Sequence, residues 1–280
     1  MIFKVNNFII VFLFLFLISC GKEKQEISKI TETNIQLQMI EAYQDGLEAL
    51  EDGDVILASK KFNEAELLFP QSEWAPRSVL MSAYSFYSQD YYTDSIFELE
   101  RFISTYPKNE NTAYAHFLLG MCYYEQIVDE KKDLGSVVKA KNKFNFIVAE
   151  YPETDFAVDA KYKVDLINDI LASKEMYVGR YYLQRKKWIP SINRFKKVLD
   201  EYQTTIYVEE ALHRLVEVHY KIGLINESEK YAKLLGYNYQ SSEWYKKSYI
   251  IFNINYKDSN KKIKKEKKNI IFKKLKNLLD

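Results

Sequence analysis

The sequence predicts an all-α protein built as a stack of about five antiparallel helix pairs. Helix breakers are scarce, because the 280 residues include only 8 glycines and 5 prolines, and long stretches without a breaker favour helices. An aromatic residue followed by proline recurs at Phe69-Pro70, Tyr106-Pro107 and Tyr151-Pro152. Small residues recur in fixed register upstream of these pairs, as expected for repeats that stack on one another.

The first 19 residues carry the pattern of an export signal. Lys4 is the only charged side chain before an apolar run from Phe8 to Ile18. This run is too short to span a bilayer, which needs about 20 residues, but its length suits the apolar region of a signal peptide. We therefore expect residues 1–19 to be removed on export.

Cys20 is the expected site of lipidation. The apolar run ends in Leu17-Ile18-Ser19-Cys20-Gly21, which resembles the lipobox of bacterial lipoproteins: the cysteine thiol takes a diacylglyceryl group, and the small residue before it permits cleavage. Several acyl chains, at about 0.8 kcal/mol per buried CH₂, give a stable membrane anchor. Residues 20–34 are then a lipidated tether. A plain secretory signal is the alternative interpretation.

The helix pairs are predicted from two small positions, 12 residues apart in four of the five copies. Antiparallel helices pack closely only where small residues face each other. In the third copy the interval is 20, because a charged loop from Asp129 to Ser136 is inserted. The first position is occupied by Gly46, Ala83, Gly120 and Gly179, with the larger Val216 as the exception, and the second by Ala58, Ser95, Ala140, Ser191 and Ser228.

This spacing resembles the tetratricopeptide repeat, which implies a right-handed superhelical α-solenoid. An ordinary helical bundle is the alternative. We expect repeats one to three in residues 35–152 and repeats four and five in residues 153–245. The stretch from Asp155 to Lys186 has no breaker except Gly179, so we expect one long helix, or two in series, to connect repeats three and four.

The concave face of the first three repeats is predicted to be a groove for substrate segments. An apolar groove of this kind suits extended or helical peptides with aromatic side chains. The alternative is that some of these aromatics are buried inside the superhelix. The corresponding positions in repeats four and five are more charged, which suits a folded protein partner. The predicted groove residues are Tyr43, Tyr84, Tyr87, Tyr114, Phe117 and Tyr124.

Residues 171–182, with Ile192-Asn193-Arg194-Phe195 and residues 201–212, resemble the BamD (ComL) family of outer-membrane assembly lipoproteins. The resemblance covers most of residues 40–235, and Pro190 and the lysine-rich tail depart from the family pattern. It implies a lipoprotein on the outer membrane that faces the periplasm. Its C-terminal repeats then bind a BamA-like β-barrel protein beside other assembly lipoproteins, and its N-terminal repeats meet unfolded outer-membrane protein segments.

For the BamA-like contact, the resemblance and the charge pattern select five residues: Arg180, Arg185, Arg194, Glu209 and Glu210. A structural salt bridge is an equal alternative for Arg194. The alternative function is another periplasmic repeat scaffold, one that serves cell-wall or pilus assembly.

No catalytic, cofactor or metal motif stands out, and we expect no enzyme. GxGxxG, GxxxxGK[ST], GxSxG and HExxH are absent, and the three histidines are spaced so that they do not share a helix face.

The remaining segment, residues 246–280, is a basic tail. From Lys257 onward it carries ten lysines against Asp258, Glu266 and Asp280, a net charge of +7, so residues 1–256 carry −6. Nucleic acid is not an expected partner, because an exported protein rarely meets it. We interpret the tail as a solvated lysine run. The alternative is an amphipathic helix through Ile271, Leu275, Leu278 and Leu279 on an anionic membrane.

Overall fold

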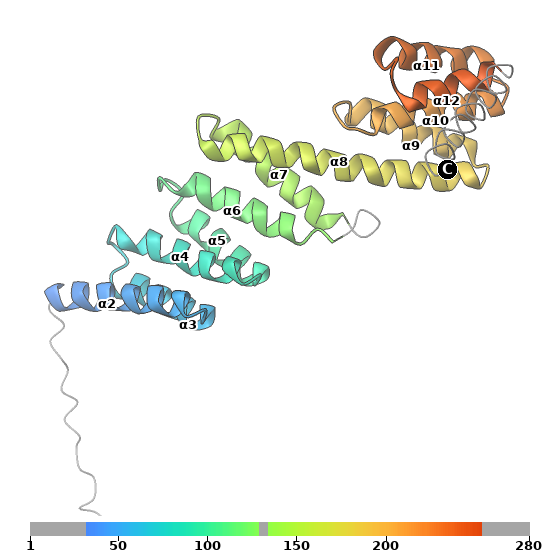
Figure 1. The fold of residues 1–280 in the computed structure, drawn as a ribbon. Coiled ribbons are helices and arrows are strands. Elements are labelled where there is room, and N and C mark those ends of the chain that lie inside the picture. Colours follow the sequence, from blue (N-terminus) through green and yellow to red (C-terminus); the bar gives the residue numbers. More distant parts are fainter. Residues whose placement is uncertain (1–31, 129–133, 254–280) are drawn as a thin grey trace, which may run out of the picture.

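The computed structural model describes residues 32–128 and 134–253. Within these ranges every regular element is an α-helix, and the helices form five antiparallel pairs followed by one more helix (Figure 1). The predicted all-α stack is therefore confirmed. The expected signal peptide, Cys20, the first part of the tether and the lysine-rich tail from residue 254 lie outside the described residues.

The pairs follow the chain in order (Figure 1). They are α2 (Glu32–Glu51) with α3 (Val55–Leu68), α4 (Trp74–Ser88) with α5 (Tyr92–Thr105), α6 (Thr112–Glu125) with α7 (Gly135–Glu150), α8 (Asp155–Gln184) with α9 (Trp188–Glu201), and α10 (Val208–Lys221) with α11 (Ile225–Asn238). The last helix is α12 (Glu243–Phe252), so residues 246–252 belong to the folded stack and not to the tail.

The first four pairs each place a small side chain of one helix opposite a larger side chain of the other. A methyl group on Gly46, Gly120 or Gly179 would lie only 2.9, 2.7 or 2.5 Å from the ring of Phe62, Phe144 or Phe195. Repeat two has Ala83 and Leu99 at these positions, both fully buried. The sizes therefore compensate, since a larger residue on the first helix accompanies a smaller one on the second.

The second small position adds a hydrogen bond where it is serine. Ser95, Ser191 and Ser228 donate to the carbonyl oxygens of Ala83, Gly179 and Val216, at 2.9, 2.9 and 2.8 Å. In all three cases the partner is the first small position, 12 residues earlier. The 12-residue interval predicted from the sequence thus corresponds to a direct contact between the two helices of a pair.

The second helix of the first four pairs ends at an aromatic residue that leaves the helical conformation. Phe69, Tyr106 and Tyr151 have φ of −142°, −122° and −130°, and each precedes a proline, which disfavours the α region at the residue before it. Tyr202 has φ of −131° although glutamine follows it. Pro190 falls in the first turn of α9, where its missing N–H needs no helical partner.

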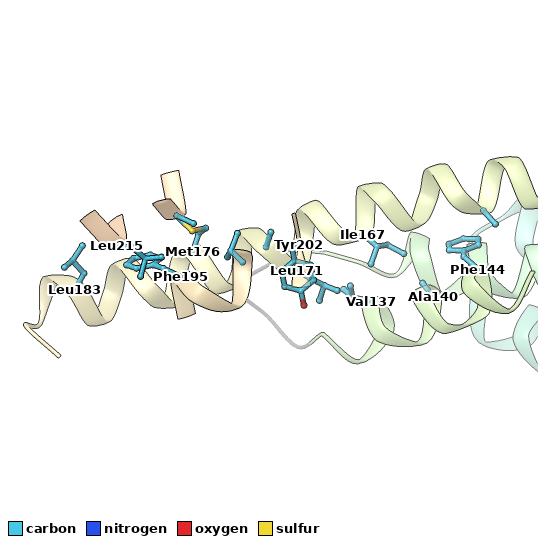
Figure 2. Close-up of a cluster of buried hydrophobic side chains, with 14 of the residues drawn as sticks. Val137, Ala140, Phe144, Ile167, Leu171, Met176, Leu183, Phe195, Tyr202 and Leu215 are labelled. Carbon is cyan, nitrogen blue, oxygen red and sulfur yellow. The ribbon is translucent and has the colours of Figure 1, made fainter. Parts of the chain in front are cut away.

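Residues 155–184 form one continuous helix, the longest of the described chain. One apolar cluster runs along it, from Val137 and Phe144 of α7 to Phe195 and Tyr202 at the end of α9 (Figure 2). Packing is therefore continuous across the expected boundary at residue 152. None of the helices in the described ranges is long and apolar enough to cross a membrane.

Candidate functional site

A groove of about 520 Å³ lies between α4 and α6, the first helices of repeats two and three. Leu80 and Tyr84 of α4 and Tyr114 of α6 line it, together with the charged side chains of Arg77 and Glu110. Tyr84 is 39% exposed. Burial raises the pKa of Tyr114 to about 12, further above physiological pH than the ordinary value, and the neutral phenol can donate a hydrogen bond. The groove offers aromatic surface with a polar hydroxyl and one charge of each sign.

The other predicted groove residues are packed to different degrees. Tyr43 is buried, with its ring centroid 5.2 Å from that of Phe62 and 5.1 Å from that of Trp74. It therefore belongs to the core of repeat one, and a partner in the groove does not reach it. This is the alternative that the sequence left open for these aromatics.

Tyr87, Phe117 and Tyr124 are half-buried and continue the aromatic strip beyond Tyr84 and Tyr114. Tyr87 packs against Tyr92, and Phe117 packs against Phe156 at the start of α8. The ammonium group of Lys163 lies 4.2 Å from the ring centroid of Tyr124. The open part of the groove is thus centred on Tyr84 and Tyr114.

A second groove, also of about 520 Å³, lies between α8 and α10 and is charged. Side chains in the groove form a ladder of ion pairs with one another and with Glu210 beside it. Arg180 pairs with Glu210 at 3.0 Å, and Arg214 pairs with Glu210 at 3.1 Å and with Glu217 at 2.9 Å. Lys221 completes the ladder on Glu217 at 2.6 Å.

Basic side chains outnumber acidic ones at this surface, which we call the charged ladder. Four basic residues line the groove, Arg180, Lys186, Arg214 and Lys221, while Glu217 is the only acidic residue that does so. Burial raises the pKa of Glu217, but hydrogen bonds from Lys221 and Arg214 outweigh it and hold the pKa below its ordinary value. Leu183 and Trp188 add apolar surface. The surface offers Arg and Trp, the side chains that most often anchor protein interfaces.

The five residues predicted for the partner contact do not converge on one spot. Arg180 and Glu210 pair within the ladder. Arg185 is exposed and follows Arg180 at the end of α8. Its guanidinium lies 4.4 Å from the ring centroid of Tyr181. Glu209 lies near the turn between α11 and α12, where it accepts a hydrogen bond from Ser242.

Arg194 is held in an internal ion pair. Its guanidinium lies 2.9 Å from one oxygen of Glu175, and Lys197 lies 2.9 Å from the other. Glu175 is only 7% exposed. Burial raises the pKa of this carboxyl, but the bonds from Arg194 and Lys197 hold it below its ordinary value. The structural role that the sequence left open for Arg194 is thus the one its geometry supports.

Sequence reasoning missed Arg214, Lys221 and Trp188 in this surface. A signal for the first two was present, because Glu210, Arg214, Glu217 and Lys221 follow each other at intervals of four, three and four residues. Opposite charges at these intervals share one helix face and form pairs. Trp188 carried no such signal, because it begins α9 and reaches the groove only through the turn after α8.

The three histidines are buried and take part in packing. The His116 ring lies 4.6 Å from that of Phe146, and Nδ1 of His213 lies 2.8 Å from the hydroxyl of Ser248. Burial lowers the pKa of His116 and of His213 to about 4, so both are neutral at physiological pH. His219 bonds the carbonyl of Leu215. Across the described ranges, no three histidine, cysteine or acidic side chains gather as metal ligands would.

Comparison with known proteins shows clear relatives. The model of the YfiO family, described as an outer membrane lipoprotein, matches residues 35–234. The outer membrane protein assembly factor BamD of Caulobacter vibrioides is 39% identical over 235 residues, which cover 84% of this chain and 76% of the relative. The protein of the same name from Rickettsia prowazekii is 37% identical over 222 residues, covering 79% and 88% of the two chains.

Among solved structures, the TPR2AB domain of yeast Sti1 aligns with a TM-score of 0.45 and 11% identity, over 76% of this chain and 81% of that one. A thermophilic TPR protein of Thermus thermophilus aligns with a TM-score of 0.35 and 13% identity, over 76% and 98% of the two chains.

Proposed function

The chain belongs to the BamD family of outer membrane protein assembly factors, and we propose that it serves the outer-membrane β-barrel assembly machinery as a scaffold without catalytic activity. It binds a BamA-like barrel protein through its C-terminal repeats and segments of unfolded outer-membrane proteins through its N-terminal repeats. The observation that carries this proposal is the contrast between the two grooves, one aromatic and one charged, on a single stack.

The charged ladder suits a folded partner. Glu210 and Glu217 each pair with two basic side chains, and these pairs restrain the charged side chains before a partner arrives. Preorganisation of this kind lowers the entropic cost of binding. Excess positive charge from Lys186 and the exposed Arg185 favours an acidic patch on the partner and speeds association. Arg180 and Glu210 remain the best candidates of the original five.

The aromatic groove suits an unfolded segment. Between Tyr84 and Tyr114 a peptide side chain can pack on ring faces, and the Arg77 and Glu110 side chains can pair with charges on the peptide or with its backbone. Outer-membrane strands alternate apolar and polar residues and end in aromatic girdles. Such segments therefore fit the aromatic groove better than they fit the charged ladder.

We also propose that a lipid on Cys20 anchors the chain to the outer membrane with its repeats in the periplasm, as the lipobox-like sequence indicates. Labelled palmitate should enter the wild type and not the Cys20→Ser variant. Equal labelling of both would contradict this anchor and leave the repeat surfaces unaffected.

A pull-down from detergent-solubilised outer membranes tests the main proposal. We expect a large β-barrel protein to co-purify with the wild type and its recovery to fall several-fold in Arg180→Ala. This variant keeps its fold, since Glu210 retains its pair with Arg214 and exposed pairs contribute about 0–1 kcal/mol. Lys60→Ala, at an exposed site on α3 that lines neither groove, is the control.

Recovery of no barrel protein with the wild type would contradict the proposal. Recovery of cell-wall or pilus components in its place would favour the alternative scaffold function. Tyr84→Ala is expected to keep the barrel protein and to lose unfolded substrate, which separates the two surfaces in one experiment.

A further inference from the structure

The second helix of the last pair, α11, is less well covered than the corresponding helices before it. Its buried side chains are Ser228 and Leu235 alone, whereas six are buried in α3 of the first pair. In each earlier step the next helix packs on the second helix of the preceding pair, but α12 packs mainly on α10. The end of a repeat stack exposes the face that a further repeat would bury, and it needs a cap.

A groove of about 520 Å³ runs between α11 and α12 at this end. Tyr245 of α12 approaches α11 closely at Gly236, where a methyl group would lie 2.7 Å from the tyrosine ring. Next to Gly236 in the chain, Tyr237 is 85% exposed, although it also lines the groove. Tyr245, Tyr249 and Phe252 line the same groove, and a contiguous exposed aromatic surface of this kind indicates a binding site.

The chain leaves the described structure at this same groove. Phe252 and Asn253 both line it, and residues 254–280 follow directly. Within that segment, Ile271, Leu275, Leu278 and Leu279 are spaced so that they would share one face of a helix, and Lys273 and Lys274 would lie off that face. The intervening residues 254–266, at about 3.3 Å each, give more than enough length to fold back onto the groove.

We propose that residues 267–279 form an amphipathic helix that lies in the groove between α11 and α12 and caps the end of the stack. The apolar face of this helix covers Tyr237 and the neighbouring rings, and the lysines face solvent. Folding back also brings a segment of charge +7 onto a body of charge −6, which lowers the electrostatic self-energy of the chain.

Disulfide trapping in the full chain tests the position of this cap. Tyr237→Cys combined with Leu275→Cys should give an intramolecular cross-link on mild oxidation, identified by mass spectrometry of the linked peptides. Cys122 does not compete, because it is buried and burial raises its pKa to about 11. The control pair, Leu67→Cys with Leu275→Cys, places the first cysteine at a similarly open site on α3, and we expect at least a fivefold lower yield.

Equal yields for the two pairs would overturn the proposal, and so would cross-links found only in dimers, which would mean that the segment occupies a second copy. Hydrogen exchange gives a second test. Ile271→Asp with Leu275→Asp should raise exchange in α11, while Lys273→Gln with Lys274→Gln should leave it unchanged. If α11 exchange does not respond and the apolar variant instead loses binding to phosphatidylethanolamine–phosphatidylglycerol vesicles, the segment is a membrane contact and the cap is wrong.

Discussion

At the scale of single residues, the stack depends on the match between Gly179 and Phe195. Alanine is a better helix former than glycine by about 1 kcal/mol, so propensity alone predicts that Gly179→Ala stabilises the chain. The added methyl would lie 2.5 Å from a ring that is fully buried. Overpacking of this kind costs about 1–3 kcal/mol. This cost equals or exceeds the gain in helix propensity, so we expect the clash to make Gly179→Ala destabilising.

We expect Gly179→Ala to lower the free energy of unfolding in urea titration by up to about 2 kcal/mol, the difference between these two effects. Adding Phe195→Leu should restore part of the loss, because the double variant copies the Ala83 and Leu99 pair of repeat two. A double variant that is less stable than Gly179→Ala alone would show that ring crowding is not the cause.

Glu175 gives a pH-dependent prediction. Its folded-state pKa lies below that of the unfolded chain, which is about 4.3. The stabilisation is therefore fully present above the unfolded pKa and is lost as pH falls through the folded pKa. Glu175→Gln should lower stability at pH 7 by about 1–2 kcal/mol, a range discounted for the exposure of Arg194, and by much less near pH 3.

Unfolding curves at the two pH values check this, with Glu201→Gln as the control. Glu201 is 55% exposed and pairs only loosely, at 3.8 Å from Lys197, so its replacement should have no measurable effect. An equal loss of stability at both pH values for Glu175→Gln would mean that the carboxyl acts through packing and not through its charge.

At the scale of the elements, the helix pairs could be predicted because their contact positions are small residues at a fixed interval. Ser95, Ser191 and Ser228 report that contact directly through their hydrogen bonds. The continuity of α8 could not be decided, because residues 155–184 bury a face on both α7 and α9, and such a pattern fits one helix or two. The α12 helix was missed because its buried residue is Ser248, which carries no apolar signal.

The long helix α8 packs against α7 of the first half of the stack and against α9 of the second half. Asp165→Pro, at an exposed site in its middle, should break it at a cost of about 3 kcal/mol. The apolar cluster along α8 couples the unfolding of the two halves. A break in α8 should remove this coupling, so we expect thermal unfolding of the proline variant to split into two transitions. Asp165→Ala is the control and should keep a single transition. One unchanged transition for the proline variant would mean that the halves are coupled without α8.

At the scale of the whole molecule, the sequence predicted the family and the contrast between the two halves, but not the geometry of either surface. Tyr43 and Arg194 have the residue types of a binding site, yet Tyr43 packs in the core and Arg194 binds Glu175. Whether such a side chain is available to a partner depends on the neighbours that it meets in the fold, which the spacing of the repeats does not give. Tyr84 and Arg180, which occupy the same position of repeats two and four, line open grooves.

Site-specific photo-crosslinking in intact cells tests the central claim most directly, with a photoreactive residue placed either at Tyr84 or at Trp188. The account predicts that position 188 captures a β-barrel protein and that position 84 captures unfolded outer-membrane proteins. Each position should capture little of the other's partner. Capture of the same partner from both positions, or of no outer-membrane protein from either, would contradict the division of the stack into two binding surfaces.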